Sequence, residues 1–585
     1  MSFVDYLFPK PKELNILSSN PASFNSKVEK LYDSSLSDES YRLIIRENEI
    51  KSFASSQAGH FYAEKTVSQL NKINKLHPVY EVEIIDFPDY KQRGVMLDVS
   101  RDKVHKMQYL KNLLVLLSEF KLNHVELYFE HSFAYKNHKE VWKDATPFNA
   151  EELQDLKTFA KTLHINLVAN QNTLGHMERW LIHEAYRPLA FKPEGFRDNL
   201  GMLRPPSTLN PTSQEAFKLV SELLNELDEV INSNQFNVGL DEPWELFGKD
   251  PFLWLNWLKE LSDLKLMRSK EILIWGDYLA SYPNLTPSIP ENVQVIEWGY
   301  ESNHPWQSRL EKFKLHKINF WSAPGTSAWL SILGRFENMA KNIQSCVSQS
   351  SGAQGILTTD WGDFGHLQPS CIAECGLFFG AAAAWNIHWA LSLTPNEVAS
   401  LCDFHVWGSQ DAIYSIVKGL SSFNDCFPLK VPNMAGIIAN LYFPQLPTGT
   451  GLTTGVNTNN LNDALEIINS YNKEIDAFFD KDKKKELKWA TDLVSHLLKD
   501  HLTRLKYDGR IESVPEKERQ VLLKELNLLI ESYPEIYTLY FRQGGFKESV
   551  RWLTNLRDVY ETGQTNINWA GPLTETFYQH HPIPS

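Results

Sequence analysis

Cysteine is scarce in this chain. Five of its 585 residues are cysteines, and they lie far apart: Cys346, Cys371, Cys375, Cys402 and Cys426. Domains that depend on disulfides carry more cysteines at regular spacings, so a disulfide framework is excluded and a reducing compartment fits. Cys371 and Cys375 lie four residues apart on a predicted helix. Because no His or Cys follows them at zinc-site spacing, we expect buried core thiols and no metal site.

Long apolar runs are also missing. No stretch reaches the roughly 20 apolar residues that a membrane helix needs. The first twelve residues, MSFVDYLFPKPK, lack the basic region and the continuous apolar region of a signal peptide. The sequence therefore predicts a soluble, cytoplasmic protein that does not associate with membranes.

Basic residues are outnumbered, with 58 Lys and Arg against 72 Asp and Glu and a net charge of −14. An acidic surface repels phosphate backbones, so nucleic acid is not an expected partner. No nucleotide-binding loop, His-Glu-x-x-His motif or Ser-centred nucleophile elbow occurs, and we expect no cofactor. A hydrophobic content of 42% in a chain this long predicts several folded units with a large core.

The hydrophobic pattern changes twice along the chain. Strand-like runs at 41–46 and 49–54 and a helical stretch at 63–73 predict a small α+β domain over residues 1–87. From residue 394 onward the strand-like runs stop, and helical periodicity predicts an all-helical domain over residues 394–585.

Between these two parts, apolar strand-like runs alternate with amphipathic helical segments. The eight runs are Gly94–Val99, His124–Phe129, Asn166–Asn170, Phe236–Leu240, Ile272–Trp275, Val293–Trp298, Ile318–Trp321 and Gly355–Thr359. Eight such units in about 300 residues are typical of a (β/α)8 TIM barrel, here over residues 88–393. The class is α/β, and the active site is expected at the carboxyl ends of the strands.

Two adjacent carboxylates, Asp241 and Glu242, follow the fourth run directly. Neighbours in a strand face opposite ways, so both can serve one pocket only if the chain is already leaving the strand. Close carboxylates push one pKa upward, which suits acid-catalysed bond cleavage. Taken alone, the pair is more simply interpreted as a structural feature, with Asp241 as a helix N-cap and Glu242 in the first turn of that helix.

Other chemical groups gather at the remaining strand ends. Tryptophans stand at the ends of four successive runs, where they would form an aromatic wall suited to the apolar faces of sugars. Arg, His and acidic residues stand at the start or the end of the other runs. The candidate substrate-binding residues are Arg93, Glu130, His176, Trp275, Trp298, Tyr300, Trp321, Trp361 and Asp363.

Several of these motifs carry a family resemblance. The run 93–101 (RGVMLDVSR), the Gly175-His176 step, the 239–242 step (GLDE) and the Trp-Gly-Asp boxes resemble the glycoside hydrolase family 20 β-N-acetylhexosaminidases. Segments 172–178 and 238–242 look most like the intracellular hexosaminidase D branch. The resemblance covers most of residues 40–390 and leaves the helical part uncovered.

The resemblance implies an exo-β-N-acetylhexosaminidase with a retaining, substrate-assisted mechanism. Glu242 would be the general acid and base, and Asp241 would hold the acetamido N–H. Arg93 would grip ring hydroxyls, and His176 would support the carboxylates. The substrate would be a glycan or glycoconjugate that ends in β-linked GlcNAc or GalNAc.

The sequence departs from the family pattern at two points. Where the family usually has a Tyr after strand seven, this chain has 322–326 (SAPGT), with Tyr300 as a substitute, and Glu130-His131 replaces paired aspartates after strand two. A catalytically silent glycan-binding protein and a glycosidase of another β-linkage stay open as alternatives. The preferred sugar, a homo-oligomeric state and the role of the helical part are not decided by the sequence.

Overall fold

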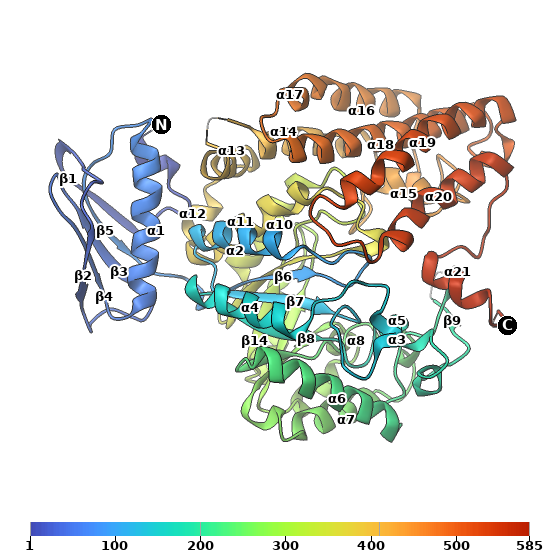
Figure 1. Cartoon of the computed structure of the whole chain (residues 1–585), viewed down its shortest axis with the longest axis horizontal. Helices are drawn as coiled ribbons and strands as arrows, with labels where there is room; N and C mark the ends of the chain where they lie inside the picture. The colour runs from blue at the N-terminus through green and yellow to red at the C-terminus, as the bar shows by residue number, and fades with distance from the viewer. Residues whose placement is uncertain (1, 199–200, 409, 584–585) are drawn as a thin grey trace.

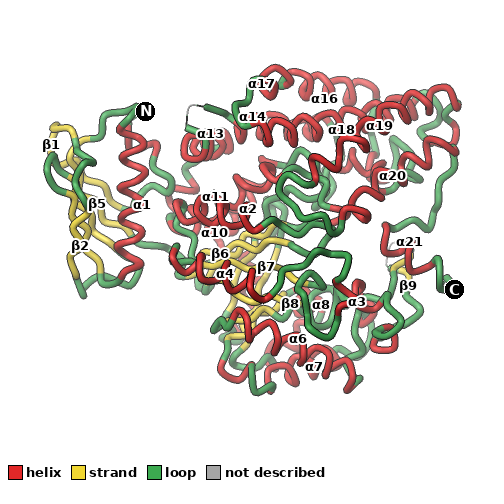
Figure 2. Tube along the Cα trace, in the orientation of Figure 1, coloured by secondary structure: helices red, strands yellow, loops and turns green. Residues whose placement is uncertain are grey.

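The computed structural model describes residues 2–198, 201–408 and 410–583. The fold has three parts, whose bounds differ from these ranges. A small sheet with one helix lies at one end, a barrel lies in the middle, and helices of the last third pack along one side of the barrel (Figure 1). Figure 2 shows the barrel strands enclosed by helices and loops. The domain boundaries at residues 87 and 393 stay predictions. Among the described residues, no helix combines the length and hydropathy that crossing a bilayer requires.

The first part is a five-stranded sheet covered by one helix. Its strands, in the order β1-β5-β3-β4-β2, are β1 (Glu13–Pro21), β5 (Tyr80–Asp86), β3 (Tyr41–Ile45), β4 (Ile50–Ala54) and β2 (Val28–Tyr32). Residues of β3 and β4 alternate between buried and half-buried, as expected for strands with one face against a helix. Helix α1 (Gln57–Asn74) is preceded by its N-cap Ser56, whose hydroxyl accepts the N–H of Gly59.

The second part is a closed barrel of eight parallel strands, which confirms the predicted TIM-barrel class. The strands are β6 (Gln92–Asp98), β7 (His124–Phe129), β8 (Asn166–Gln171), β11 (Gln235–Asn237), β12 (Glu271–Trp275), β13 (Val293–Trp298), β14 (Phe320–Ala323) and β15 (Gly355–Asp360). Each of the eight predicted runs overlaps one of them. The longer helices that follow the strands are α2 (Met107–Glu119), α4 (Ala150–Thr162), α6 (Gln214–Ile231), α7 (Phe252–Asp263), α9 (Trp306–Leu315), α10 (Phe336–Gln349) and α11 (Ser370–Trp385).

Trp321 lies inside the barrel and not at its mouth, so its prediction as a wall of the sugar site is wrong. It is the second residue of β14 and pairs laterally with Gly355, the first residue of β15. Its ring is fully buried, 4.9 Å from the ring of His124, and its Nε1–H donates to Gln294 Oε1 at 2.7 Å. The tryptophan therefore fills the barrel near the strand starts.

The last third of the chain is helical and shares one hydrophobic core with the barrel. Its main helices are α13 (Pro395–Val406), α14 (Ile413–Ser421), α16 (Thr458–Ser470), α18 (Lys481–Leu505), α19 (Glu516–Tyr537), α20 (Phe546–Thr562) and α21 (Pro572–Tyr578). Helix α11 is buried along its whole length, because strands on one side and helices α10, α13 and α14 on the other cover it. It carries Cys371 and Cys375, both buried free thiols as predicted.

A buried ion pair anchors the helical part to the barrel. Lys483 on α18 donates from Nζ to Glu374 Oε1 on α11 at 2.7 Å and to the Ser370 hydroxyl at 2.6 Å. Both charged side chains are at most 6% exposed. A buried charge is tolerated only when it is paired and hydrogen-bonded, so this contact fixes how α18 sits on the barrel.

Arg93 lies at the amino end of β6, opposite the predicted site, and its prediction as a sugar-binding residue is wrong. Its side chain is fully buried and donates to Glu39 Oε2 at 2.7 Å and to the Lys121 carbonyl at 2.7 Å. The guanidinium also lies 4.8 Å from the ring of Trp385. Arg93 thus joins the small N-terminal sheet to the base of the barrel.

We expect Arg93→Met to lower the free energy of unfolding by about 3–5 kcal/mol, because it leaves Glu39 partly buried without its partner. The KM for a glycoside should not change. Arg46→Met is the matched control, because its side chain is 53% exposed and such surface pairs contribute at most about 1 kcal/mol. Chemical denaturation measures the first effect and steady-state kinetics the second. A raised KM with an unchanged free energy of unfolding would show that Arg93 binds the substrate.

Candidate active site

The two adjacent carboxylates lie where the chain has left strand β11. The strand ends at Asn237, and Gly239, Leu240 and Glu242 then adopt positive φ angles of 72°, 70° and 43°. Such a turn is favourable for glycine and costly for the other two residues. A Cβ on Gly239 would overlap the Asn172 amide, so only glycine fits there. The turn lets both acids face the same side.

His176 connects the two carboxylates. Its Nε2 lies 3.2 Å from Asp241 Oδ2 and 3.4 Å from Glu242 Oε2. Its Nδ1 lies 3.2 Å from a terminal nitrogen of Arg101, which can only donate. Burial alone would lower the pKa of His176, but the charge of Asp241 and the hydrogen bonds to both acids raise that pKa well above its usual value. An Nε2–H therefore faces the two acids.

Arg101 is the group that organises the mouth of the barrel, and the sequence-based prediction missed it. The guanidinium pairs with Asp363 at 3.0 Å, with Glu130 at 3.3 Å and with Asp98 at 3.4 Å. It also lies 5.1 Å from the ring of Trp361. Arg101 follows the first barrel strand directly, and this position at a strand end is the signal that separates it from Arg93.

The predicted aromatic wall is present in part. The rings of Trp275 and Trp361 are 5.7 Å apart, and Trp361 Nε1–H donates to the Tyr300 hydroxyl at 2.8 Å. Tyr300 in turn stacks on the half-buried Trp298, with ring centroids 5.2 Å apart. These four side chains form one aromatic cluster at the ends of β12, β13 and β15.

Asp277, which follows β12, supports the catalytic turn. Its carboxylate accepts the backbone N–H of Glu242 at 3.0 Å. Burial, together with the negative charges of Asp241 and Glu242, raises the pKa of Asp277 to about 7. The turn is therefore held by a carboxyl that gains or loses its proton near neutral pH.

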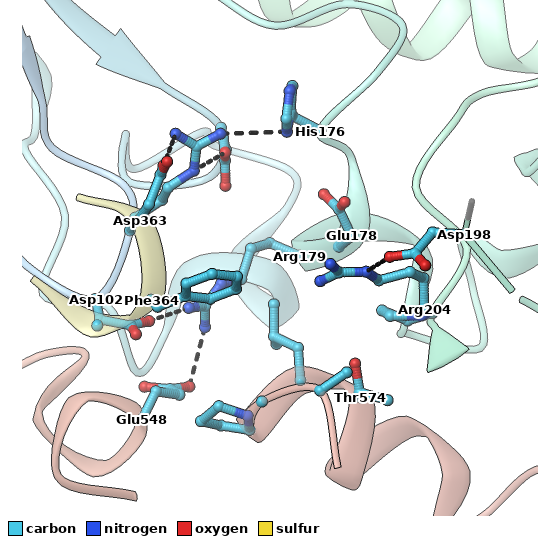
Figure 3. A pocket seen from close by; sticks show the side chains of 18 of the residues that line it. Asp102, His176, Glu178, Arg179, Asp198, Arg204, Asp363, Phe364, Glu548 and Thr574 are labelled. Atoms are coloured by element: carbon cyan, nitrogen blue, oxygen red, sulfur yellow. Dashed lines mark hydrogen bonds and ion pairs between the residues drawn. The ribbon is translucent and has the colours of Figure 1, made fainter. Parts of the chain in front are cut away.

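A cavity of about 500 Å³ opens beside these groups. It brings together Arg101, Glu130, His176, Glu242 and Asp363 from the barrel. Figure 3 shows part of this lining, with Asp363 and His176 on one side and Glu548 and Thr574 of the helical part on the other. The helical part thus lines the candidate site in the same chain. Among the described residues, no cluster of three or more His, Cys, Asp or Glu could hold a metal ion.

The closed barrel of eight parallel strands, with acids at its carboxyl end, is of the TIM-barrel class. Residues 90–313 match the family model of the glycosyl hydrolase family 20 catalytic domain. Residues 90–313 are therefore similar to the catalytic domain of that family, and the protein is a glycoside hydrolase.

Two curated relatives and one solved structure are similar to this chain. Hexosaminidase D of Bos taurus is 24% identical over 298 residues, which cover 46% of this chain and 83% of that protein. Hexosaminidase D of Homo sapiens is 22% identical over 315 residues, or 48% of this chain and 62% of that protein. A family 20 exo-β-N-acetylglucosaminidase from Vibrio harveyi shares the fold, with a TM-score of 0.53, 16% identity and coverage of 70% of this chain and 78% of that one.

The raised pKa of Asp277 predicts how stability depends on pH. A carboxyl whose pKa is about 7 in the folded protein and 3.8 when unfolded stabilises the fold while it is protonated. That contribution is lost as the pH rises from about 4 to 7. We therefore expect Asp277→Asn to flatten the fall in melting temperature between pH 5 and pH 8. Asp263→Asn, at an exposed position, is the control. Equal pH dependence in the wild type and Asp277→Asn would contradict the assignment.

Proposed function

We propose that the protein is an exo-β-N-acetylhexosaminidase that removes terminal β-linked N-acetylhexosamine by a substrate-assisted mechanism. The observation that carries this proposal is the placement of His176 within 3.4 Å of both Asp241 and Glu242. The match of residues 90–313 to the catalytic domain of glycoside hydrolase family 20 supports the same activity.

Asp241 is assigned the role of holding the substrate's acetamido group. Its Oδ2 contacts His176, whereas its Oδ1 is buried and has no hydrogen-bond partner among the described residues. A buried acceptor without a partner is costly, and an incoming N–H would satisfy it. In the proposed complex the acetamido N–H donates to Asp241 Oδ1, which aims the acetamido oxygen at the anomeric carbon.

Glu242 is assigned the role of transferring the proton. Its side chain is 30% exposed and lines the cavity, so it can reach a leaving group. In the first step Glu242 donates a proton to the leaving oxygen, the glycosidic C–O bond breaks, and the acetamido oxygen bonds to the anomeric carbon. In the second step Glu242 takes a proton from water, whose oxygen replaces the acetamido oxygen and restores the β-configuration.

The remaining groups are assigned to the sugar ring. Arg101 replaces Arg93 as the residue that grips ring hydroxyls, together with Glu130 and Asp363. Trp275, Trp298 and Trp361 flank the ring. Tyr300, whose oxygen accepts from Trp361 and whose hydroxyl also bonds the Thr359 side chain, is assigned to the acetamido oxygen, the role for which the sequence offers no Tyr after strand seven.

The expected partner is a glycan or glycoconjugate with a terminal N-acetylhexosamine. The cytoplasmic location and the absence of a cofactor stay predictions. The silent glycan-binding protein is the weaker candidate, because both carboxylates and their histidine are in place. A glycosidase of another linkage would not need the unpartnered acceptor of Asp241.

We expect Glu242→Gln to lower kcat/KM for p-nitrophenyl β-N-acetylglucosaminide by about 10²–10⁴-fold, the usual contribution of a general acid. Asp241→Asn should cost about 10²–10³-fold, because it removes a charge aimed at the transition state. Glu184→Gln, whose side chain is 85% exposed, is the matched control. Thermal unfolding of each variant shows whether the fold persists. Undiminished turnover by Glu242→Gln would refute the assigned role.

A further inference from the structure

We propose that the helical part and the loop after β8 form a second sugar-binding site on the leaving-group side of Glu242, which takes a neutral sugar ring. This inference rests on the proposed function and names the substrate class within it, namely oligosaccharides whose second residue is an uncharged sugar.

The cavity beside Glu242 has a second wall that the catalytic domain does not supply. At about 500 Å³ it lies within the range of sites that hold small-molecule ligands. Residues Glu548 and Trp552 of α20, together with 570–574, line the side away from the barrel. Across from them lie Glu178 and Arg204, which belong to the loop after β8.

This second wall is fixed to the barrel by direct contacts. The loop after β8 carries a short hairpin, β9 (Phe196–Arg197) and β10 (Leu203–Arg204). The hydroxyl of Tyr578 donates to the carbonyl of Arg204 at 2.8 Å. The Arg551 guanidinium makes two bonds of 2.8 Å to Glu575, which hold α20 to α21. The cavity therefore has two walls that are joined to each other before any ligand arrives.

Two polar side chains in this cavity have unused bonding capacity. Arg204 uses Nε to bind Asp198 at 2.9 Å, and no described residue accepts from its two terminal amino groups. No other described residue donates to the carboxylate of Glu178. In Figure 3 both side chains reach toward the same open space. Arg179, in contrast, is paired with both Asp102 and Glu548.

The chemistry of these groups fits a neutral polyol. A guanidinium that donates and a carboxylate that accepts can bind adjacent hydroxyls of one ring. The exposed ring of Trp244, 40% accessible and two residues after Glu242, lines the same cavity and offers an apolar face. An anionic ring would meet Glu178 and Glu242, and a cationic ring would meet Arg204. The position of Trp244 places the site next to the proton donor, where the leaving group departs.

The test compares two substrates that differ in the leaving group. We expect Arg204→Ala and Glu178→Gln each to lower the ratio of kcat/KM for N,N′-diacetylchitobiose to that for p-nitrophenyl β-N-acetylglucosaminide by about tenfold, the effect of one lost charge-assisted hydrogen bond. The loss should appear mainly as a raised KM for the disaccharide. Arg197→Ala, on the paired strand of the same hairpin but exposed, and Glu184→Gln are matched controls that should leave the ratio unchanged.

Each of the following results would overturn one part of this proposal. An unchanged ratio in both variants, with the aryl substrate still turned over, overturns the second site. Release of intact disaccharide from p-nitrophenyl diacetylchitobioside, reduced by the same variants, overturns its placement on the leaving-group side. Wild-type protein that cleaves neither acetamido substrate overturns the proposed function, and the second site falls with it. Thermal unfolding of the variants separates a lost contact from a lost fold.

Discussion

The site depends on one half-buried guanidinium. Arg101 pairs with carboxylates that follow the first, second and eighth barrel strands, and through His176 it reaches the acids after the fourth. Two of these carboxylates, Asp98 and Glu130, are buried, and a buried charge is stable only when it is paired in good geometry. The ends of separate strands are therefore held in one arrangement, and the position of Glu242 depends on contacts made on the far side of the mouth.

The helical part packs on the barrel from outside and contacts the loop after β15, which carries Asp363. Three successive residues of the loop after β15 adopt left-handed backbone conformations, with φ values of 53° at Phe364, 94° at Gly365 and 54° at His366. Strained backbone of this kind persists where surrounding structure holds it. The Ser549 hydroxyl donates to the Gly365 carbonyl at 2.6 Å, and the Trp552 ring packs 5.2 Å from that of Phe364. Helix α20 thereby fixes the loop after β15, and this loop positions Asp363 against Arg101.

Much of this architecture could be predicted from the sequence, because the strands and the acid pair are local patterns. Eight apolar runs with helical segments between them specify the barrel, and Asp241-Glu242 follows its strand directly. The errors came from position along a strand. Arg93 and Asp98 bound a six-residue stretch of β6, so they lie about 17 Å apart toward opposite ends of the barrel. Trp321 was assigned to a strand end, but β14 continues to Ala323. The cavity wall from Glu548 to Thr574 could not be predicted, because no local pattern reports a contact between segments more than 300 residues apart.

The central claim is that the substrate's own acetamido group takes part in the reaction, held by Asp241. Its most direct test is the release of p-nitrophenol by the purified protein from the β-N-acetylglucosaminide, the β-N-acetylgalactosaminide and the β-glucoside, measured side by side. The account predicts turnover of at least one acetamido sugar and none of the glucoside. Comparable turnover of the glucoside would contradict it, because that sugar has no acetamido oxygen to attack the anomeric carbon.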